Sequence, residues 1–218
     1  MQTFDKPAGI PVFPPHHDPK GNCVLALLLA IEPWRNERVW PSGYAGGIAH
    51  RLDTSTSGAL LIADSPEELV EIRQRFTQGQ LTKEYLLRTA RSPSWDTNQI
   101  DLPLAHHKTK KGRVIVKRGN NTPHRGKWYP AATSFARIDR EIFSATMRSG
   151  FMHQIRAHAG FLGMPILGDR HYGGGQTPPD AEVGITFYLH HCGLSGENGF
   201  RTTPVPLPKW AALSKNQS

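Results

Sequence analysis

The spacing of apolar residues changes from segment to segment along this chain, and each spacing predicts a different element. The continuous apolar run "VLALLLAI" at residues 24–31 predicts a short buried helix, with Asp18 and Pro19 as start signals upstream. This run is well short of the roughly 20 residues that a membrane-spanning helix needs. The opening of the chain has four prolines and no export signal, so we expect no membrane partner.

Two further segments have helical spacing. Residues 64–76, "DSPEELVEIRQRF", predict a helix with Ser65 as its N-cap, Pro66 at its first position and Glu68 completing a capping box. Residues 152–163, "MHQIRAHAGFLG", predict another helix, and their last residue, a glycine, suits its C-terminal cap. The expected core stripe of this second helix comprises Met152, Ile155, Ala159 and Leu162.

Alternating apolar and polar residues predict strands elsewhere. The segments are residues 82–90, 131–138, 141–149 and 184–195. Helices mixed with adjacent strand pairs indicate an α+β fold with a mixed, mostly antiparallel central sheet and flanking helices and loops. No repeat and no long linker interrupts the sequence, so we expect residues 1–218 to form a single domain.

Charge and cysteine content add to this picture. The net charge is +8, and residues 106–129 hold eight Lys/Arg and no Asp/Glu, so the rest of the chain is balanced. Such a segment is typical of a loop or ribbon that binds a polyanion, or of a solvated surface hairpin. The two cysteines, Cys23 and Cys192, do not make a disulfide framework and favour a reducing compartment.

Candidate chemistry gathers at the entry to a buried strand, in "HRLDTSTSGALLIA" at residues 50–63. Asp53 closes the polar part of this stretch. Burial alone would neutralise its carboxyl group, whereas a neighbouring guanidinium keeps it ionised and usable as a nucleophile or base. Arg51 and Arg156 are the candidate partners. The alternative is that Asp53 only caps a turn.

A second polar cluster lies on the helix predicted at residues 152–163. Its members are His153, Gln154, Arg156 and His158. A buried arginine here requires an acidic partner, and the alternative is a polar face that is simply solvated. The chain has eleven histidines, but no Cys-x-x-Cys or His-Glu-x-x-His spacing, so we expect no metal. The "GGG" stretch at 173–175 lacks the context of a phosphate loop and is interpreted as a flexible loop.

Three spaced motifs, taken together, resemble the RluA family of RNA pseudouridine synthases. In chain order they are "HRLDTSTSGALLIA", "KEYLL" and "HQIRAHAGFLGMPILGDRHYGG". The closing "LHHCGLS" and the proline-rich "TTPVPLPKW" fit the same family. The resemblance runs from "FDKPAG", which begins at residue 4, to residue 210. It implies the catalytic-domain fold of these enzymes, with an active-site cleft across the sheet.

The resemblance also implies a role for each group. Asp53 is the catalytic aspartate, Arg156 its salt-bridge partner and Tyr85 the aromatic group that stacks on the target base. The substrate-binding set that we expect comprises Arg51, which fills the gap left by the extruded base, with Lys83 of the Lys-x-Tyr motif, His50, His153 and Gln154. We add Lys108, Lys110 and Lys111 of the basic segment as phosphate contacts, independently of the family motifs. No cofactor is implied.

The sequence departs from the family pattern in two places. Phe151 stands where the family has an arginine before the "HQIR" block, so the contact of that arginine is lost or replaced. Thr54 follows the motif aspartate in place of a charged residue. We also expect no separate N-terminal RNA-binding domain, so that target choice would come from the loops of the catalytic domain itself.

The expected function is isomerisation of specific uridines in structured ribosomal or transfer RNA, in the cytoplasm and without an obligatory protein partner. Two alternatives remain open at this point. One is a catalytically inactive RNA-binding protein on the same fold, suggested by Phe151. The other is a metal-dependent hydrolase that uses His50, Asp53, His153 and His190.

Overall fold

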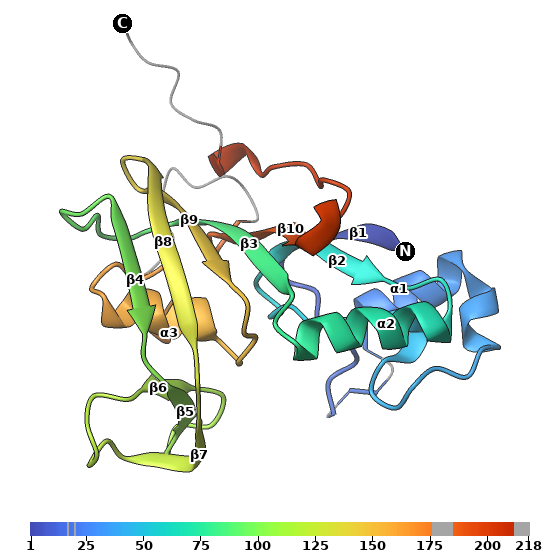
Figure 1. Ribbon diagram of the computed structural model, residues 1–218, viewed down its shortest axis with the longest axis horizontal. Coiled ribbons are helices and arrows are strands. Elements are labelled where there is room, and N and C mark those ends of the chain that lie inside the picture. The colour runs from blue at the N-terminus through green and yellow to red at the C-terminus, as the bar shows by residue number, and fades with distance from the viewer. Residues whose placement is uncertain (17, 20, 176–184, 212–218) are drawn as a thin grey trace, which may run out of the picture. The chain divides into compact units, whose positions relative to one another are not determined.

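The computed structural model of the chain describes residues 1–16, 18–19, 21–175 and 185–211 (Figure 1). Its helices are α1 (Val24–Ile31), α2 (Pro66–Thr77) and α3 (Gln154–Phe161). Its strands are β1 (Gln2–Lys6), β2 (Ser57–Ile62), β3 (Leu81–Arg88), β4 (Thr97–Asp101), β5 (Leu104–His107), β6 (Val114–Val116), β7 (His124–Tyr129), β8 (Ala132–Asp139), β9 (Ile142–Met147) and β10 (Leu189–Gly196). Short 3₁₀ segments lie at Pro33–Asn36, Ala45–Gly47, Glu197–Gly199 and Lys209–Ala211.

The strands form two sheets. The larger has the order β1-β2-β10-β3-β9-β8-β4, and the smaller has the order β6-β5-β7. β10 runs parallel to β2, while β1 with β2, β4 with β8, β8 with β9 and both pairs of the small sheet are antiparallel. The predicted α+β class with a mixed, mostly antiparallel sheet is therefore confirmed.

The chain divides into two compact units. Unit 1 comprises Met1–Lys83 and His190–Leu207, and unit 2 comprises Glu84–Leu189 and the described residues that follow Leu207. A single catalytic domain over residues 1–218 stays a prediction. Among the described residues, no helix is long and apolar enough to cross a membrane.

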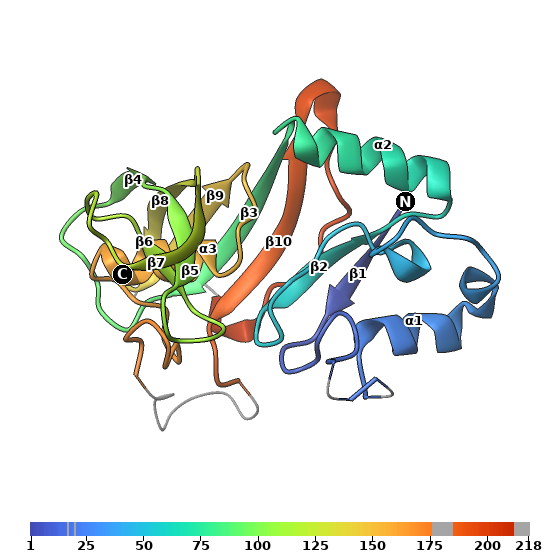
Figure 2. The same cartoon turned by 90° about the horizontal axis from the view of Figure 1, so that it is seen from below.

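In unit 1, α2 packs on the sheet through its apolar face. The core there comprises Ala49, Leu61, Ala63, Leu69, Ile72, Leu81 and Leu194. The predicted helix start is confirmed, because the Ser65 hydroxyl accepts the Glu68 N–H at 3.2 Å. Glu68 returns its carboxylate to the N–H of Asp64 at 2.7 Å. Figure 2 shows β10 running beside β2, with which it is paired.

The first helix, α1, differs from its prediction in two respects. The apolar run is helical over the predicted residues, but its N-cap is Cys23, whose sulfur accepts the Ala26 N–H at 3.4 Å. Asp18 and Pro19 are therefore not its start. The helix is also only partly buried: Val24 and Leu28 are covered, whereas Ile31 is 71% exposed.

In unit 2, β8 pairs with β4 on one side and with β9 on the other, and the small sheet lies beyond the end of β4 and the start of β8 (Figure 1). α3 packs against β8 and against the small sheet. The core cluster at that junction comprises Leu104, Val114, Val116, Ala131 and Ala157. The predicted stripe of α3 is buried at Ile155 and Ala159, and most of the helix is covered, including its polar residues.

Candidate active-site residues

Asp53 lies in unit 1, in a turn that leads directly into β2. Its carbonyl accepts the N–H of Thr56 at 3.0 Å, and its side chain is half-buried. Gly58, the second residue of β2, is required by close packing, because it has φ 110° and a Cβ there would lie 2.1 Å from the carbonyl oxygen of His191. Gly58 therefore lets β2 approach β10 closely just after the turn that carries Asp53.

Lys6, the last residue of β1, binds the backbone of the Asp53 turn through its side chain. Its side chain is fully buried, and its ammonium donates to the carbonyls of Pro7 at 2.9 Å, Thr54 at 3.1 Å and Thr56 at 2.7 Å. The N–H of Gly9 adds a fourth bond, to the Thr54 carbonyl at 2.8 Å. The first strand thus fixes the backbone on which Asp53 stands. Our sequence reasoning missed Lys6, and the only signal for it was its position in "FDKPAG".

Lys6 also contributes to the electrostatics of the turn. Burial lowers the pKa of its ammonium from 10.5 to about 8, and the negative charge of Asp53 acts in the opposite direction. The cation therefore lies close enough to the aspartate to interact with it, while its own hydrogen bonds go to backbone carbonyls.

Three buried histidines, His50, His190 and His191, lie beside β2, the strand that follows this turn. His50 Nε2 accepts the N–H of Leu61 at 3.1 Å, and its ring meets that of His191 edge-on at 5.3 Å between centroids. Burial lowers the pKa of His190 to about 4 and of His191 to about 3. These rings are therefore neutral and hold neighbouring strands together. The substrate-binding role of His50 stays a prediction, and Leu61 and His191, which it contacts, are both buried.

Two further predicted residues of unit 1 are Lys83 and Arg51. The Lys83 ammonium lies 5.2 Å from the centroid of the Phe76 ring. Burial, with the charge of Arg73 as a second cause, lowers the pKa of Lys83 to about 8. Arg51 is exposed, and its guanidinium lies 6.0 Å from the ring centroid of Phe13.

Unit 2 contains Arg156, held in a buried ion pair. Its Nε donates to Asp169 Oδ2 at 2.8 Å and its Nη2 to Asp169 Oδ1 at 3.0 Å, and both side chains are almost fully covered. The guanidinium also lies 5.3 Å and 5.2 Å from the rings of Tyr172 and Phe187. The acidic partner that a buried arginine requires is therefore Asp169, which our sequence analysis missed. Pairing of Arg156 with Asp53 stays a prediction.

The middle residue of the "GGG" stretch packs against the backbone next to this ion pair, while flexibility of the stretch stays a prediction. Gly174 is buried, and its N–H donates to the carbonyl of Asp169 at 2.8 Å. A Cβ on Gly174 would lie 1.7 Å from the carbonyl oxygen of Ile166. Glycine is needed here for a tight turn that packs backbone against backbone.

The beginning of α3 is fixed by two side-chain networks. His153, the N-cap, has φ 55°, a left-handed conformation that is uncommon outside glycine. Its Nδ1 lies 3.1 Å from the Tyr172 hydroxyl, which also accepts the N–H of Val114 at 2.9 Å. Both ends of the Gln154 side-chain amide form hydrogen bonds inside the protein. Its NH₂ group donates to Ala132 and Thr133, and its oxygen accepts from Ser149 and Phe151.

Phe151, where the family has an arginine, lies in an aromatic cluster. Its ring stacks on Tyr129 with centroids 4.5 Å apart and tilts against His106 at 5.4 Å. The contact of the missing arginine is therefore replaced by apolar packing between the start of α3 and the small sheet. Lys108, Lys110 and Lys111 lie exposed on the connection between β5 and β6.

Tyr85, the remaining predicted catalytic residue, is buried on β3. The predicted set is thus distributed over the two units. Asp53, Arg51, His50 and Lys83 belong to unit 1, and Tyr85, Arg156, His153, Gln154 and the three lysines belong to unit 2. Within the described part of the chain, no three His, Cys, Asp or Glu side chains are grouped to hold a metal ion.

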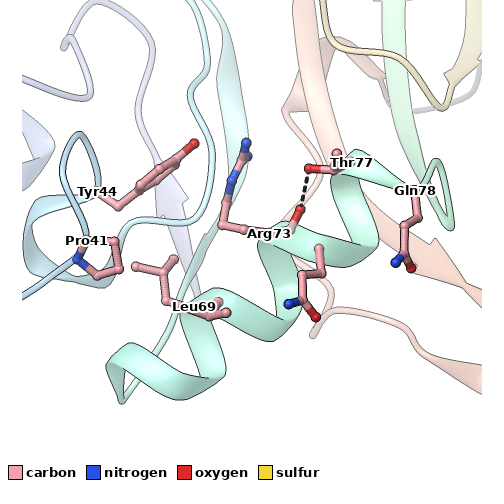
Figure 3. Close-up of a pocket in the computed structure, with 8 residues that line it drawn as sticks. Pro41, Tyr44, Leu69, Arg73, Thr77 and Gln78 are labelled. Carbon is pink, nitrogen blue, oxygen red and sulfur yellow. Dashed lines mark hydrogen bonds between the residues drawn. The ribbon is translucent and has the colours of Figure 1, made fainter.

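Unit 1 also has a surface pocket of about 310 Å³ beside α2 (Figure 3). Its lining residues are Pro41, Tyr44, Leu69, Val70, Arg73, Gln74, Thr77 and Gln78. The Arg73 guanidinium stands 4.7 Å from the Tyr44 ring centroid and donates to the Ala49 carbonyl at 3.1 Å. None of the predicted site residues lines this pocket.

Comparison with solved structures identifies the fold. The chain superposes on "Human RNA Pseudouridylate Synthase Domain Containing 1" with a TM-score of 0.69 at 19% identity, covering 94% of this chain and 79% of that one. A second human protein, "RNA Pseudouridylate Synthase Domain Containing 4", gives a TM-score of 0.68 at 20% identity and covers 95% and 85%. The catalytic-domain fold of pseudouridylate synthases is therefore confirmed.

Sequence comparison agrees with the fold. The family described as "RNA pseudouridylate synthase" matches residues 2–160. An uncharacterised RNA pseudouridine synthase of Zymomonas mobilis is 35% identical over 210 residues, which covers 94% of this chain and 89% of that protein. This chain therefore belongs to the RNA pseudouridylate synthase family, and the resemblance to its RluA members is confirmed.

Other relatives are longer than this chain. The chloroplastic RNA pseudouridine synthase 2 of Oryza sativa is 32% identical over 131 residues, and the match covers 59% of this chain and 29% of the rice protein. Ribosomal large subunit pseudouridine synthase D of Haemophilus ducreyi is 29% identical over 180 residues, covering 81% of this chain and 51% of that protein. The chain thus spans about half of these relatives or less.

Proposed function

We propose that this protein is an RNA pseudouridine synthase that converts specific uridines to pseudouridine with Asp53 as the attacking group. The observation that carries this proposal is the Asp53 turn. It contains the aspartate of the family motif, and the buried Lys6 ammonium and the Gly9 N–H hold its backbone from the first strand and the segment after it. A nucleophile on a braced turn keeps its geometry when a bulky substrate binds.

The reaction requires no group from outside the chain. The bond between N1 of uracil and C1′ of ribose breaks, the base rotates, and a bond forms between C5 and C1′. N1 gains a proton and C5 loses one, so atoms and charge balance without a redox partner. Because the reacting atoms are inaccessible in a base stack, the uridine must be extruded, which costs a few kcal/mol.

The remaining residues support this chemistry. We expect Arg156, whose guanidinium plane is held by Asp169, to be the cation that keeps the Asp53 carboxylate ionised when RNA is bound. Tyr85 stacks on the extruded base, and Arg51 fills the gap that it leaves. His153, Lys83, His50 and Gln154 belong to the same proposed substrate-binding set. His50 and Gln154 also hold neighbouring segments of the protein through their hydrogen bonds.

The substrate is structured RNA, either ribosomal or transfer RNA, and the reaction takes place in the cytoplasm. The name of the Haemophilus ducreyi relative, a ribosomal large subunit pseudouridine synthase, supports a ribosomal target. The excess positive charge of residues 106–129 supports a polyanionic substrate, because phosphate contacts can offset the cost of extrusion.

The activity is tested by digesting RNA to nucleosides after incubation with the protein and separating pseudouridine from uridine by chromatography. Ribosomal and transfer RNA that lack modifications are the two substrates. We expect pseudouridine with wild type and none with Asp53→Ala, while RNA binding persists in the variant. Substantial turnover by Asp53→Ala would exclude the aspartate as the nucleophile. Binding without product in either protein would favour the inactive RNA-binding alternative.

Lys108, Lys110 and Lys111 are tested through the salt dependence of RNA affinity. Replacing all three by Gln should weaken binding and reduce the slope of log affinity against log salt, by about 0.7 to 0.9 for each lost phosphate contact. The maximal isomerisation rate at saturating RNA should change little. An unchanged slope would show that the RNA runs elsewhere on the protein.

A further inference from the structure

The small sheet of unit 2 presents an aromatic pair on its edge strand, β7. The rings of His124 and Trp128 lie with centroids 4.2 Å apart and an interplanar angle of 36°. The ammonium of Lys117 stands 5.9 Å from the Trp128 ring centroid. All three side chains are half-buried, so each keeps part of its surface in solvent.

β7 has a bulge in the stretch that carries this aromatic pair. Leu104 of β5 is paired with Tyr129, but His106, two residues on, is paired with Arg125, so β7 has extra residues at this point. Gly126 has φ 76°, and no atom lies within 4 Å of where its Cβ would be. The bulge interrupts the ladder at an edge strand, which protects the edge from pairing with another chain and re-aims the side chains beside it.

Core packing does not account for Trp128. The cluster beneath the small sheet is built from Leu104, Val114, Val116, Ala131 and Ala157, with Leu102, Phe151, Met152 and Tyr172 packed against it. Tyr129, the next residue along β7, joins this side by stacking on Phe151. Trp128 instead contacts a histidine and a lysine. Tryptophan is enriched at binding surfaces, where its ring supplies apolar area at a position that remains partly solvated.

The side chains around the aromatic pair are positively charged, which favours a negatively charged ligand. Arg118, Arg125 and Lys127 are exposed close to it in sequence, and the whole segment 106–129 has no acidic residue. Flat aromatic rings interleaved with cations match a ligand that alternates flat bases with phosphates. Single-stranded nucleic acid offers both, whereas a duplex offers phosphates and hides the faces of its bases.

We propose that the His124–Trp128 pair is a stacking platform for an unpaired nucleobase of the RNA substrate. The base takes the position over the indole that Lys117 occupies, and the lysine ammonium moves to a neighbouring phosphate. This inference rests on the proposed function and adds to it: part of the recognised RNA is a single-stranded loop or end, read by the small sheet and distinct from the target uridine.

The test compares the affinities of a short unstructured oligouridylate and of a duplex RNA of equal length. Trp128→Leu keeps apolar bulk but removes the stacking face, and its matched control is Trp95→Leu. Trp95 is also a half-buried tryptophan of unit 2, but it packs edge-on against Phe143 beside the acidic Asp96. Urea unfolding establishes that each variant is folded, and Trp128→Phe tests whether a smaller ring restores binding.

We expect Trp128→Leu to lose about 5- to 160-fold in affinity for the single strand, and little for the duplex, because stacking of one base contributes about 1 to 3 kcal/mol. Trp128→Phe should recover most of the loss, and Trp95→Leu should bind like wild type. Equal losses for both RNAs, or no loss for either, would overturn the inference. Absence of pseudouridine with wild type would instead contradict the proposed function, so the two failures are distinguishable.

Discussion

Lys6 is the residue on which the geometry of the Asp53 turn depends most directly. A fully buried ammonium normally pairs with a carboxylate, but the Lys6 ammonium donates to three backbone carbonyls, two of them in the turn itself. Because these bonds go to the main chain, they form whatever side chains the turn carries. The Asp53 turn is thus positioned by a residue 47 places earlier in the sequence.

Replacing Lys6 with methionine keeps the stem and removes the three hydrogen bonds. The Thr54 and Thr56 carbonyls then lose a charged donor inside the protein, so we expect the free energy of unfolding to fall by about 1 to 3 kcal/mol. The isomerisation rate should fall more than RNA affinity does, because the turn loses its brace. Urea unfolding and single-turnover kinetics measure the two effects.

The control for the stability measurement is Lys111→Met, which removes an exposed lysine and should leave the free energy of unfolding unaltered. It serves for stability only, because Lys111 is a proposed phosphate contact. A Lys6→Met protein as stable and as active as wild type would show that the turn does not depend on these bonds.

At the scale of elements, the start of α3 is tied to the small sheet through Tyr172. The hydroxyl binds the β6 backbone at Val114 and the ring nitrogen of His153, which has a left-handed backbone conformation. Such a conformation persists where surrounding contacts hold it. The helix that carries Arg156 is therefore positioned at its N-terminus by the same residue whose ring lies beside the guanidinium.

Tyr172→Phe should loosen this connection. Because the Val114 N–H loses its acceptor, we expect faster hydrogen exchange at that amide and a loss of about 1 to 3 kcal/mol in the free energy of unfolding. Tyr129→Phe is the matched control, since no hydrogen bond of the Tyr129 hydroxyl is found among the described residues. Unchanged protection of the Val114 amide in Tyr172→Phe would contradict this account.

Elements with local signals could be predicted from the sequence, and those that depend on distant partners could not. The helix at 64–76 and the strand at 82–90 were predicted because their caps and alternation lie within the segment. The start of α1 was placed wrongly because its cap is the cysteine Cys23, outside the usual Ser, Thr, Asp and Asn. Lys6 and Asp169 were missed because their partners in the fold are not marked by any local pattern.

At the scale of the whole molecule, the buried histidines make stability depend on pH. His190 and His191 have pKa values of about 4 and 3 in the folded protein because of burial, against about 6.5 in an unfolded chain. The unfolded state therefore binds more protons between these values. The free energy of unfolding should be highest above about pH 6.5 and should fall as the pH falls from there toward 4.

This dependence can be assigned with His191→Asn, whose amide N–H can still donate to the carbonyl of Ala59, the partner of His191 Nδ1 at 2.5 Å. Urea midpoints measured at about pH 7 and pH 5 should drop less in the variant than in wild type. Parallel pH profiles for the two proteins would show that His191 is not a source of the effect.

The central claim is that this chain isomerises uridine in RNA through Asp53. The measurement that tests it most directly is release of tritium from RNA labelled at C5 of uracil, because forming the new carbon-carbon bond must expel that hydrogen. We predict release by wild type on ribosomal or transfer RNA that lacks modifications, and none by Asp53→Asn, which keeps the size of the side chain. Equal release by both proteins, or no release by wild type from either bound RNA, would contradict the account.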